Sequence, residues 1–146
     1  MPLEQKTRIL LAEDNLGDAD LMKEALEEGS HLVEIEVARD GFAALDYLRR
    51  TGDYAGATRP DLVILDLNLP KKDGREVLAE VKSDENLKSI PVIVLSTSVS
   101  TDDVRMSYRL GANSFINKPM GVDALFDMAG KLEEYWFRIV KLPKAN

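Results

Sequence analysis

Residues 62–74 read LVILDLNLPKKDG, and this stretch decides the fold. Its first four residues are aliphatic without interruption, which is typical of a short strand buried on both faces of a parallel sheet. Asp66 ends the run, and Pro70 and Gly74 place the following residues in a loop. Open α/β sheets bind their ligands outside the carboxyl ends of the strands, so Asp66 is the first candidate functional residue.

Similar short segments occur on both sides of this one. We expect strands at Arg8–Ala12, Val33–Ala38, Leu62–Leu65, Val92–Leu95 and Ser114–Asn117. Between these segments and after the last one, apolar residues recur at helical spacing. The alternation predicts an α/β fold, (βα)5, with a doubly wound five-stranded parallel sheet, helices on both faces and the flavodoxin-like strand order 2-1-3-4-5.

Length and composition narrow the class of protein. With 146 residues, 45% of them hydrophobic, we expect residues 1–146 to form a single domain with its core at about residues 8–143. Only four residues follow Leu142, so no output domain is expected. The absence of cysteine excludes disulfides and thiolate metal sites. The net charge of -7 disfavours binding to nucleic acid.

The sequence also predicts a cytoplasmic protein that does not bind membranes. The start of the chain, MPLEQKTR, is polar and does not resemble a signal peptide. No apolar stretch approaches the ~18 residues that a membrane span needs.

Charged residues follow three of the predicted strands. Glu13 and Asp14 follow the first strand, Asp66 the third, and Lys118 the fifth. In the doubly wound order these strand ends are neighbours, so three carboxylates would converge. Like charges at short range raise one another's pKa unless a cation intervenes, and without cysteine or histidine a hard divalent metal is indicated, Mg²⁺ above all. Lys118 can pair with a carboxylate at rest and with a phosphoryl oxygen later.

Each of these residues also has a plain local explanation. Asp14 or Asn15 can cap a helix that begins after the first strand. Asp66 can be an acid in a turn, and a lysine such as Lys118 is usually solvated. Their joint occurrence at three strand ends favours a functional site. His31 lies in a polar connection and is expected to have no catalytic role.

Four motifs occur in order, each at the end of a predicted strand. They are Glu13-Asp14, Asp66 with Asn68, Pro70 and Gly74 behind it, Ser96 at the end of the fourth strand, and Lys118-Pro119. In this combination the chain resembles the receiver domain of two-component response regulators, over roughly Arg8 to Pro143. The start EDN at residues 13–15 and the tail EEYWFRIVKLP at residues 133–143 further resemble the stand-alone receivers paired with bacterial phytochromes.

The resemblance implies a signalling protein that catalyses only its own phosphorylation and dephosphorylation, and is otherwise not an enzyme. Asp66 would accept a phosphoryl group from a phosphohistidine of a sensor histidine kinase, which can be a bacterial phytochrome. Lys118 and the Ser96 hydroxyl would hold phosphoryl oxygens. Mg²⁺ would be bound by Glu13, Asp14, Asp66 and the backbone carbonyl of Asn68. Mn²⁺ can replace it, and Ca²⁺ can substitute in crystals.

Further positions take their roles from the same resemblance. Ser96 and Phe115 would be the switch residues, Phe115 reporting the active state by packing inward because it lacks a hydroxyl. Thr97, where a small residue is usual, would narrow access to the phosphoryl group and change its lifetime. The kinase would meet one side of the first helix, at Asn15, Gly17, Asp18 and Leu21.

The last helix is expected to continue close to Pro143. Its sheet-facing residues are predicted to be Val122, Leu125, Ala129, Leu132, Trp136 and Val140. Met128, Tyr135 and Leu142 repeat at intervals of seven beside that face. Scattered exposed apolar residues are common, but we favour a partner surface here, namely a homodimer through the fourth and fifth helices and the fifth strand.

Two other functions compete with the receiver. A Mg²⁺-dependent phosphohydrolase of the haloacid dehalogenase type also uses a strand-end aspartate as nucleophile, but it normally needs an acid two residues later, where this chain has Asn68. A receiver that only binds partners without being phosphorylated would not need the complete acidic site. The cognate kinase, its stimulus and the downstream target cannot be identified from the residues.

Overall fold

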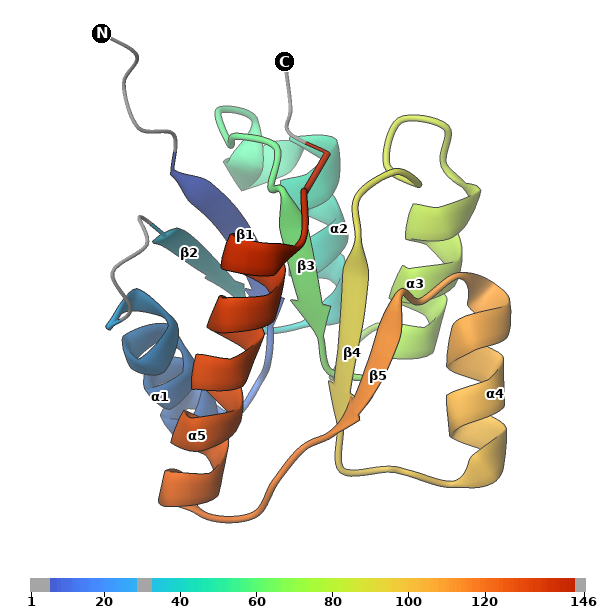
Figure 1. Ribbon diagram of the computed structural model, residues 1–146. Helices are drawn as coiled ribbons and strands as arrows, with labels where there is room; N and C mark the ends of the chain where they lie inside the picture. Colours follow the sequence, from blue (N-terminus) through green and yellow to red (C-terminus); the bar gives the residue numbers. More distant parts are fainter. Residues whose placement is uncertain (1–5, 29–32, 144–146) are drawn as a thin grey trace, which may run out of the picture.

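The computed structural model describes residues 6–28 and 33–143 (Figure 1). Its parallel sheet has five strands in the order β2-β1-β3-β4-β5, which confirms the predicted topology. The strands are β1 (Thr7–Ala12), β2 (Val33–Ala38), β3 (Leu62–Leu65), β4 (Val92–Ser96) and β5 (Ser114–Asn117). The α-helices are α1 (Leu16–Glu27), α2 (Gly41–Arg49), α3 (Gly74–Ser83), α4 (Thr101–Leu110) and α5 (Val122–Glu133), and a 3-10 helix, η1 (Gly52–Tyr54), precedes β3.

Alternate residues of each central strand face two different layers of helices. In β1, Ile9 and Leu11 belong to a cluster with residues of α1 and α5, whereas Leu10 and Ala12 belong to a cluster with residues of α2 and α3. In Figure 1, α1 and α5 lie in front of the sheet and α2 and α3 behind it. Because both faces are covered, the central strands are aliphatic at successive positions rather than at alternate ones.

The helices α1 to α4 begin at the edge where the strands end, and a polar side chain caps each of them. The capping residues are Asn15, Asp40, Asp73 and Ser100, whose side-chain oxygens accept backbone N–H bonds of the first turn. After each of the first four strands, a polar residue therefore caps the start of the next helix. The positive ends of these helix dipoles lie toward the carboxyl edge of the sheet, where an anion is favoured.

Helix α4 is less buried than its apolar spacing predicts. Val104 is only partly buried, Met106 and Tyr108 are exposed, and the small Ser107 is its one buried residue. Figure 1 shows the reason, because α4 stands at the outer edge of the sheet beside β5. The helix is thus amphipathic in sequence but leaves apolar side chains at the surface.

The last helix continues to Ile139, four residues before Pro143, but not as a regular α-helix. The α-helix ends at Glu133 and is followed by a π-helical segment, η2 (Glu134–Ile139), after which Val140 is extended. A π-helical turn has hydrogen bonds between residues five positions apart instead of four. The side chains that follow it therefore point in different directions from those of a continuous α-helix. Leu132 and Phe137, five positions apart, are therefore both buried. The predicted sheet-facing positions Val122, Trp136 and Val140 are instead exposed (Val122) or partly buried.

The stripe predicted at intervals of seven is not one continuous exposed surface. Leu142 lies beyond the helix and, like Met128, packs partly buried against the core cluster of α1 and α5. Only Tyr135 of the three is exposed. The stripe was predicted from a regular α-helical period, which the segment from Glu134 to Ile139 does not have.

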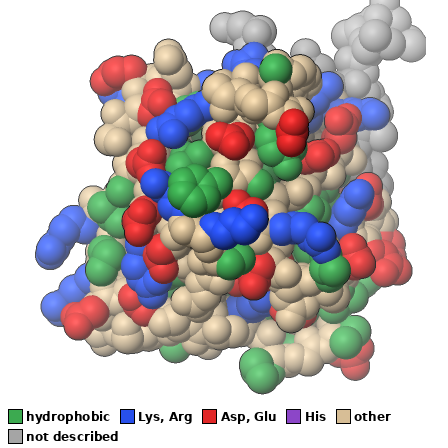
Figure 2. Space-filling model, turned by 180° about the vertical axis from the view of Figure 1, so that it is seen from behind, with side chains coloured by type: hydrophobic (Ala, Val, Ile, Leu, Met, Phe, Trp, Pro, Cys, Tyr) green, Lys and Arg blue, Asp and Glu red, His purple; other side chains and the backbone are tan. Residues whose placement is uncertain are grey.

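The face behind the sheet carries charges of both signs. Figure 2 shows lysine and arginine side chains interspersed with aspartates and glutamates over it. Pairs such as Arg49–Glu80 at 3.1 Å and Lys72–Glu80 at 2.6 Å connect α2 and the β3–α3 loop to α3. In residues 6–28 and 33–143, no helix is long and apolar enough to cross a membrane. His31 lies outside the described residues.

Candidate functional site

The backbone at the site continues the sheet one step past each strand. The N–H of Glu13 donates to the Ala38 carbonyl at 2.9 Å, and the N–H of Asp66 donates to the Ala12 carbonyl at 3.0 Å. On the other side, the Lys118 N–H donates to the Ser96 carbonyl at 2.9 Å. These bonds hold the three residues at the same carboxyl edge of the sheet, where β1 and β3 are adjacent and β4 lies between β3 and β5.

Three carboxylates come together at this edge. Oxygen atoms of Glu13, Asp14 and Asp66 all lie within 4.8 Å of one another. Glu13 and Asp66 are 2% and 8% exposed, whereas Asp14 is open to solvent. Oxygen ligands alone, with one side open to water, suit a hard divalent cation of the Mg²⁺ or Mn²⁺ type, which keeps part of its hydration shell. The residues present therefore fit a divalent metal.

Lys118 is the cation that the structure places in this cluster. It is 8% exposed and its ammonium donates a hydrogen bond to Glu13 Oε1, while Asp18 Oδ2 lies at 2.7 Å and Asp66 Oδ2 at 3.9 Å. Burial raises the pKa of Glu13, and the Lys118 bond offsets part of that rise. Burial alone would lower the pKa of Lys118, but Asp18 and Glu13 outweigh it and raise that pKa above its usual value. Lys118 is therefore charged at neutral pH.

The two oxygens of Asp66 have different surroundings. Oδ1 accepts a hydrogen bond from the Asn68 N–H at 2.9 Å, and Oδ2 is the oxygen nearer Lys118. The loop after Asp66 returns closely, because the Gly74 N–H donates to the Leu67 carbonyl at 2.9 Å. A Cβ at Gly74 would lie 2.3 Å from the Asp66 carbonyl oxygen, so only glycine permits this approach.

Ser96 connects the site to α4 through residues that the sequence reading missed. Its fully buried hydroxyl accepts from the Ser98 N–H at 3.0 Å, and the Ser98 hydroxyl donates to Asp103 in α4. Arg75 of α3 donates to the same Asp103 carboxylate from two nitrogens, at 3.1 and 2.9 Å. The hydrogen bond from Ser98 lowers the pKa of Asp103, and the hydrogen bonds from Arg75 lower it further. Charge spacing alone gives no signal for such a network, because its members come from three separate segments.

The other predicted switch and access residues lie near this network. Phe115 is partly buried against the cluster of α2 and α3, and its backbone N–H donates to the Tyr108 hydroxyl at 3.1 Å. Thr97 is exposed immediately after Ser96. Phe115 and Tyr108 thus join β5 to α4 on the side away from α5.

The four positions predicted to meet a kinase differ in their exposure to solvent. Asn15 caps α1, and both Asn15 and Gly17 are exposed. Leu21 is partly buried and packs against the core cluster of α1 and α5. Asp18 is partly buried and its carboxylate is directed to Lys118. The contact of these four residues with a kinase stays a prediction.

Residues 9–129 match the family model described as response regulator receiver domain. The chain belongs to this receiver family. The matched range includes each of the strand ends described above and most of α5, so every residue of the site lies within the match.

This receiver has relatives of nearly its own length. It is 47% identical over 137 residues to the response regulator Rcp1 of Synechocystis sp., covering 94% of this chain and 93% of Rcp1. It superposes on the crystal structure of the phosphorylated cyanobacterial phytochrome response regulator RcpA with a TM-score of 0.93 and 50% identity, over 96% of this chain and 100% of that one. The Mn(2+)-bound form of Rcp1 gives a TM-score of 0.91 and 46% identity, over 94% and 99%. The protein is a response regulator similar to those of phytochrome systems.

Proposed function

We propose that this response regulator accepts a phosphoryl group on Asp66 from the phosphohistidine of a sensor histidine kinase, in a Mg²⁺-dependent reaction. The observation that supports this most is the meeting of Glu13, Asp14 and Asp66 beside Lys118. Phosphoryl transfer needs an in-line nucleophile and positive charge around the moving group, and little covalent chemistry otherwise. A strand-end carboxylate with a buried ammonium next to it meets both needs.

Asp66 Oδ2 is the attacking atom in this proposal, because Oδ1 is already engaged by the Asn68 N–H. A bond forms between Oδ2 and phosphorus while the phosphorus–nitrogen bond to the kinase histidine breaks, and its electron pair stays on the imidazole nitrogen. Lys118 and the Ser96 hydroxyl then bind phosphoryl oxygens. The metal would be held by Glu13, Asp14, Asp66 and the Asn68 carbonyl, and when bound it supplies charge neutralisation.

The Ser96 network gives the proposed switch its path. When the Ser96 hydroxyl turns to a phosphoryl oxygen, the Ser98 N–H loses its acceptor and the bond from Ser98 to Asp103 is disturbed. Phe115 packs further inward in the same transition. The change is thereby passed to the surface of α4, β5 and α5.

The proposed phosphoryl donor is a sensor histidine kinase, including a bacterial phytochrome. Similarity to RcpA, which is a phytochrome response regulator, supports this assignment. The exposed Asn15 and Gly17 at the start of α1 lie beside the carboxylate cluster, so a kinase that reaches Asp66 would contact them. The partly buried Asp18 and Leu21 of the same helix belong to this proposed contact as well.

Acetyl phosphate tests the phosphoacceptor role directly. With Mg²⁺ present, we expect intact-mass spectrometry to detect one adduct of about 80 Da, the mass of a single phosphoryl group. Chelation with EDTA is expected to prevent the adduct, and Mn²⁺ to restore it. An adduct that forms equally well in EDTA would contradict the metal requirement. Catalytic release of phosphate from many esters, without an adduct, would identify a hydrolase instead.

Thr97→Ala is expected to shorten the lifetime of the phosphorylated protein by about twofold to tenfold. Thr97 is exposed next to Ser96, so its side chain would shield the phosphoryl group from attacking water. The loss of phosphate after removal of acetyl phosphate measures the lifetime. An equal or longer lifetime in the variant would show that Thr97 does not restrict access, and Thr101→Ala, at the exposed start of α4, is the control.

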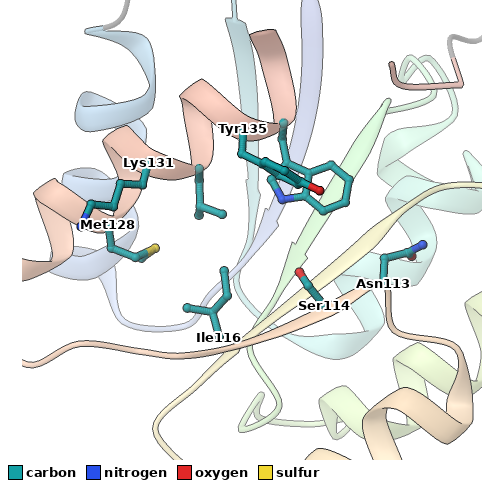
Figure 3. A pocket seen from close by; sticks show the side chains of 8 residues that line it. Asn113, Ser114, Ile116, Met128, Lys131 and Tyr135 are labelled. Carbon is teal, nitrogen blue, oxygen red and sulfur yellow. The ribbon is translucent and has the colours of Figure 1, made fainter. Parts of the chain in front are cut away.

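We also propose that the protein forms a homodimer through α4, β5 and α5. The strand β5 is an edge of the sheet, paired only with β4 among the described strands. A groove of about 360 Å³ lies between β5 and α5, and Figure 3 shows Ile116 and Met128 on its two sides with Tyr135 at one end. The exposed Tyr135 and Ile139 continue this apolar surface. An open strand edge beside apolar side chains suits a second copy of the chain.

Tyr135→Glu is expected to convert a dimer to a monomer in sedimentation experiments. The added carboxylate would be buried without a partner within the proposed interface, which lowers the dimer affinity by a factor on the order of 100. Phe42→Glu places the same charge at an exposed aromatic position on α2 and should leave the mass unchanged. If parent and Tyr135→Glu sediment identically, this surface is not the interface.

A further inference from the structure

Asp18 takes part in the site although its role was expected to lie at the kinase-facing surface. Its Oδ2 lies 2.7 Å from the Lys118 ammonium, whereas the nearer oxygen of Asp66 lies at 3.9 Å. Lys118 therefore pairs closely with Asp18 and with Glu13, but not with Asp66. The ammonium is held by Asp18 of α1 and by Glu13, which follows β1, more closely than by Asp66.

An ammonium has three donors and no acceptor. Two of these N–H groups are directed to Glu13 and Asp18. One N–H group is left to donate to an acceptor on the side of Asp66. A phosphoryl group on Asp66 would offer strong anionic acceptors that compete for this lysine. To bind this group, Lys118 would have to give up its contact with either Glu13 or Asp18.

The exposures of the two carboxylates decide which partner is released. The side chain of Glu13 is 3% exposed, so separating it from Lys118 would leave a buried charge without compensation. The side chain of Asp18 is 35% exposed and can regain water when the pair separates. An ion pair with one hydrated partner is weak and is therefore the one that exchanges.

We infer that Asp18 is the exchangeable counter-ion of Lys118, holding the ammonium away from Asp66 at rest and giving it up to the phosphoryl group. This positioning role rests on the proposed phosphoacceptor function of Asp66. In the resting protein the Asp18 carboxylate both neutralises Lys118 and adds negative charge where a phosphoryl dianion must fit. Asp18 thereby sets the affinity of the site for its phosphoryl group, and its release changes the first turn of α1.

Beryllofluoride, which binds carboxylates as a stable phosphoryl analogue, tests this inference without turnover. At saturating Mg²⁺, Asp18→Asn is expected to bind beryllofluoride more tightly than the parent by about threefold to tenfold in calorimetry, in line with the loss of one competing, partly exposed ion pair. Asp18→Glu retains the carboxylate and should return the affinity to within about twofold of the parent. Asp20→Asn, two residues along α1 and exposed, is the matched control and should have no effect.

Nitrogen NMR of the Lys118 ammonium supplies a second readout that a merely structural role of Asp18 would not change. Beryllofluoride should shift this resonance in the parent, and Asp18→Asn alone should move it part of the way. Equal or weaker beryllofluoride binding by Asp18→Asn, with an unchanged Lys118 resonance, would overturn the role of Asp18. A parent protein that binds no beryllofluoride at all would instead overturn the proposed phosphoacceptor function.

Discussion

Asp66→Asn is expected to abolish phosphorylation by acetyl phosphate while leaving the protein folded. The amide has no nucleophilic oxygen that carries charge, so the adduct of about 80 Da should fall below detection. The amide oxygen can still accept the bond from the Asn68 N–H, so the loop keeps its geometry. Intact-mass spectrometry measures the adduct, and thermal unfolding confirms the fold.

The same substitution should not lower the melting temperature. The charge of Asp66 is one of the contributions that raise the pKa of Glu13, so its removal relieves repulsion inside the carboxylate cluster. Asp53→Asn, in the exposed 3-10 helix η1, removes one charge away from the cluster and should be phosphorylated like the parent. An adduct of undiminished intensity in Asp66→Asn would place the nucleophile at another residue.

Gly74→Ala is expected to destabilise the protein by about 3 kcal/mol and to slow phosphorylation. The new Cβ would lie 2.3 Å from the Asp66 carbonyl oxygen and 2.6 Å from Leu67 Cα. Both atoms belong to backbone that the sheet and the Asp66 loop hold in place, so the strain of overpacking cannot be relieved by a side-chain rotation. A shift of the loop would move the Asp66 carboxylate itself. Urea unfolding and the rate of acetyl phosphate labelling measure the two effects.

Gly130→Ala is the matched control, because it makes the same chemical change within α5. A Cβ at Gly130 meets nothing within 4 Å. Alanine in an open helical position is more favourable than glycine by about 0.5–1 kcal/mol, so this variant should be more stable than the parent. If both variants changed stability by the same amount, the close contact at Gly74 would not explain the effect.

The sequence carries enough information for the fold and for the centre of the site. The aliphatic run before Asp66 predicts a buried parallel strand, and the observed strand β3 has the predicted bounds, Leu62–Leu65. Because the carboxyl ends of β1, β3 and β5 follow from the strand order, the meeting of Glu13, Asp66 and Lys118 could be anticipated from residues alone. These are local patterns combined with a topology that few arrangements satisfy.

Side-chain pairing and the end of the last helix were decided only by the tertiary structure. The contact of Asp18 with Lys118 depends on how the first turn of α1 faces the end of β5, and no spacing along the chain encodes that orientation. The bonds from Ser98 and Arg75 to Asp103 join a loop and two helices for the same reason. In the last helix, a regular period favours burying Trp136, but the π-turn buries Phe137 because packing against the core outweighs local helical geometry.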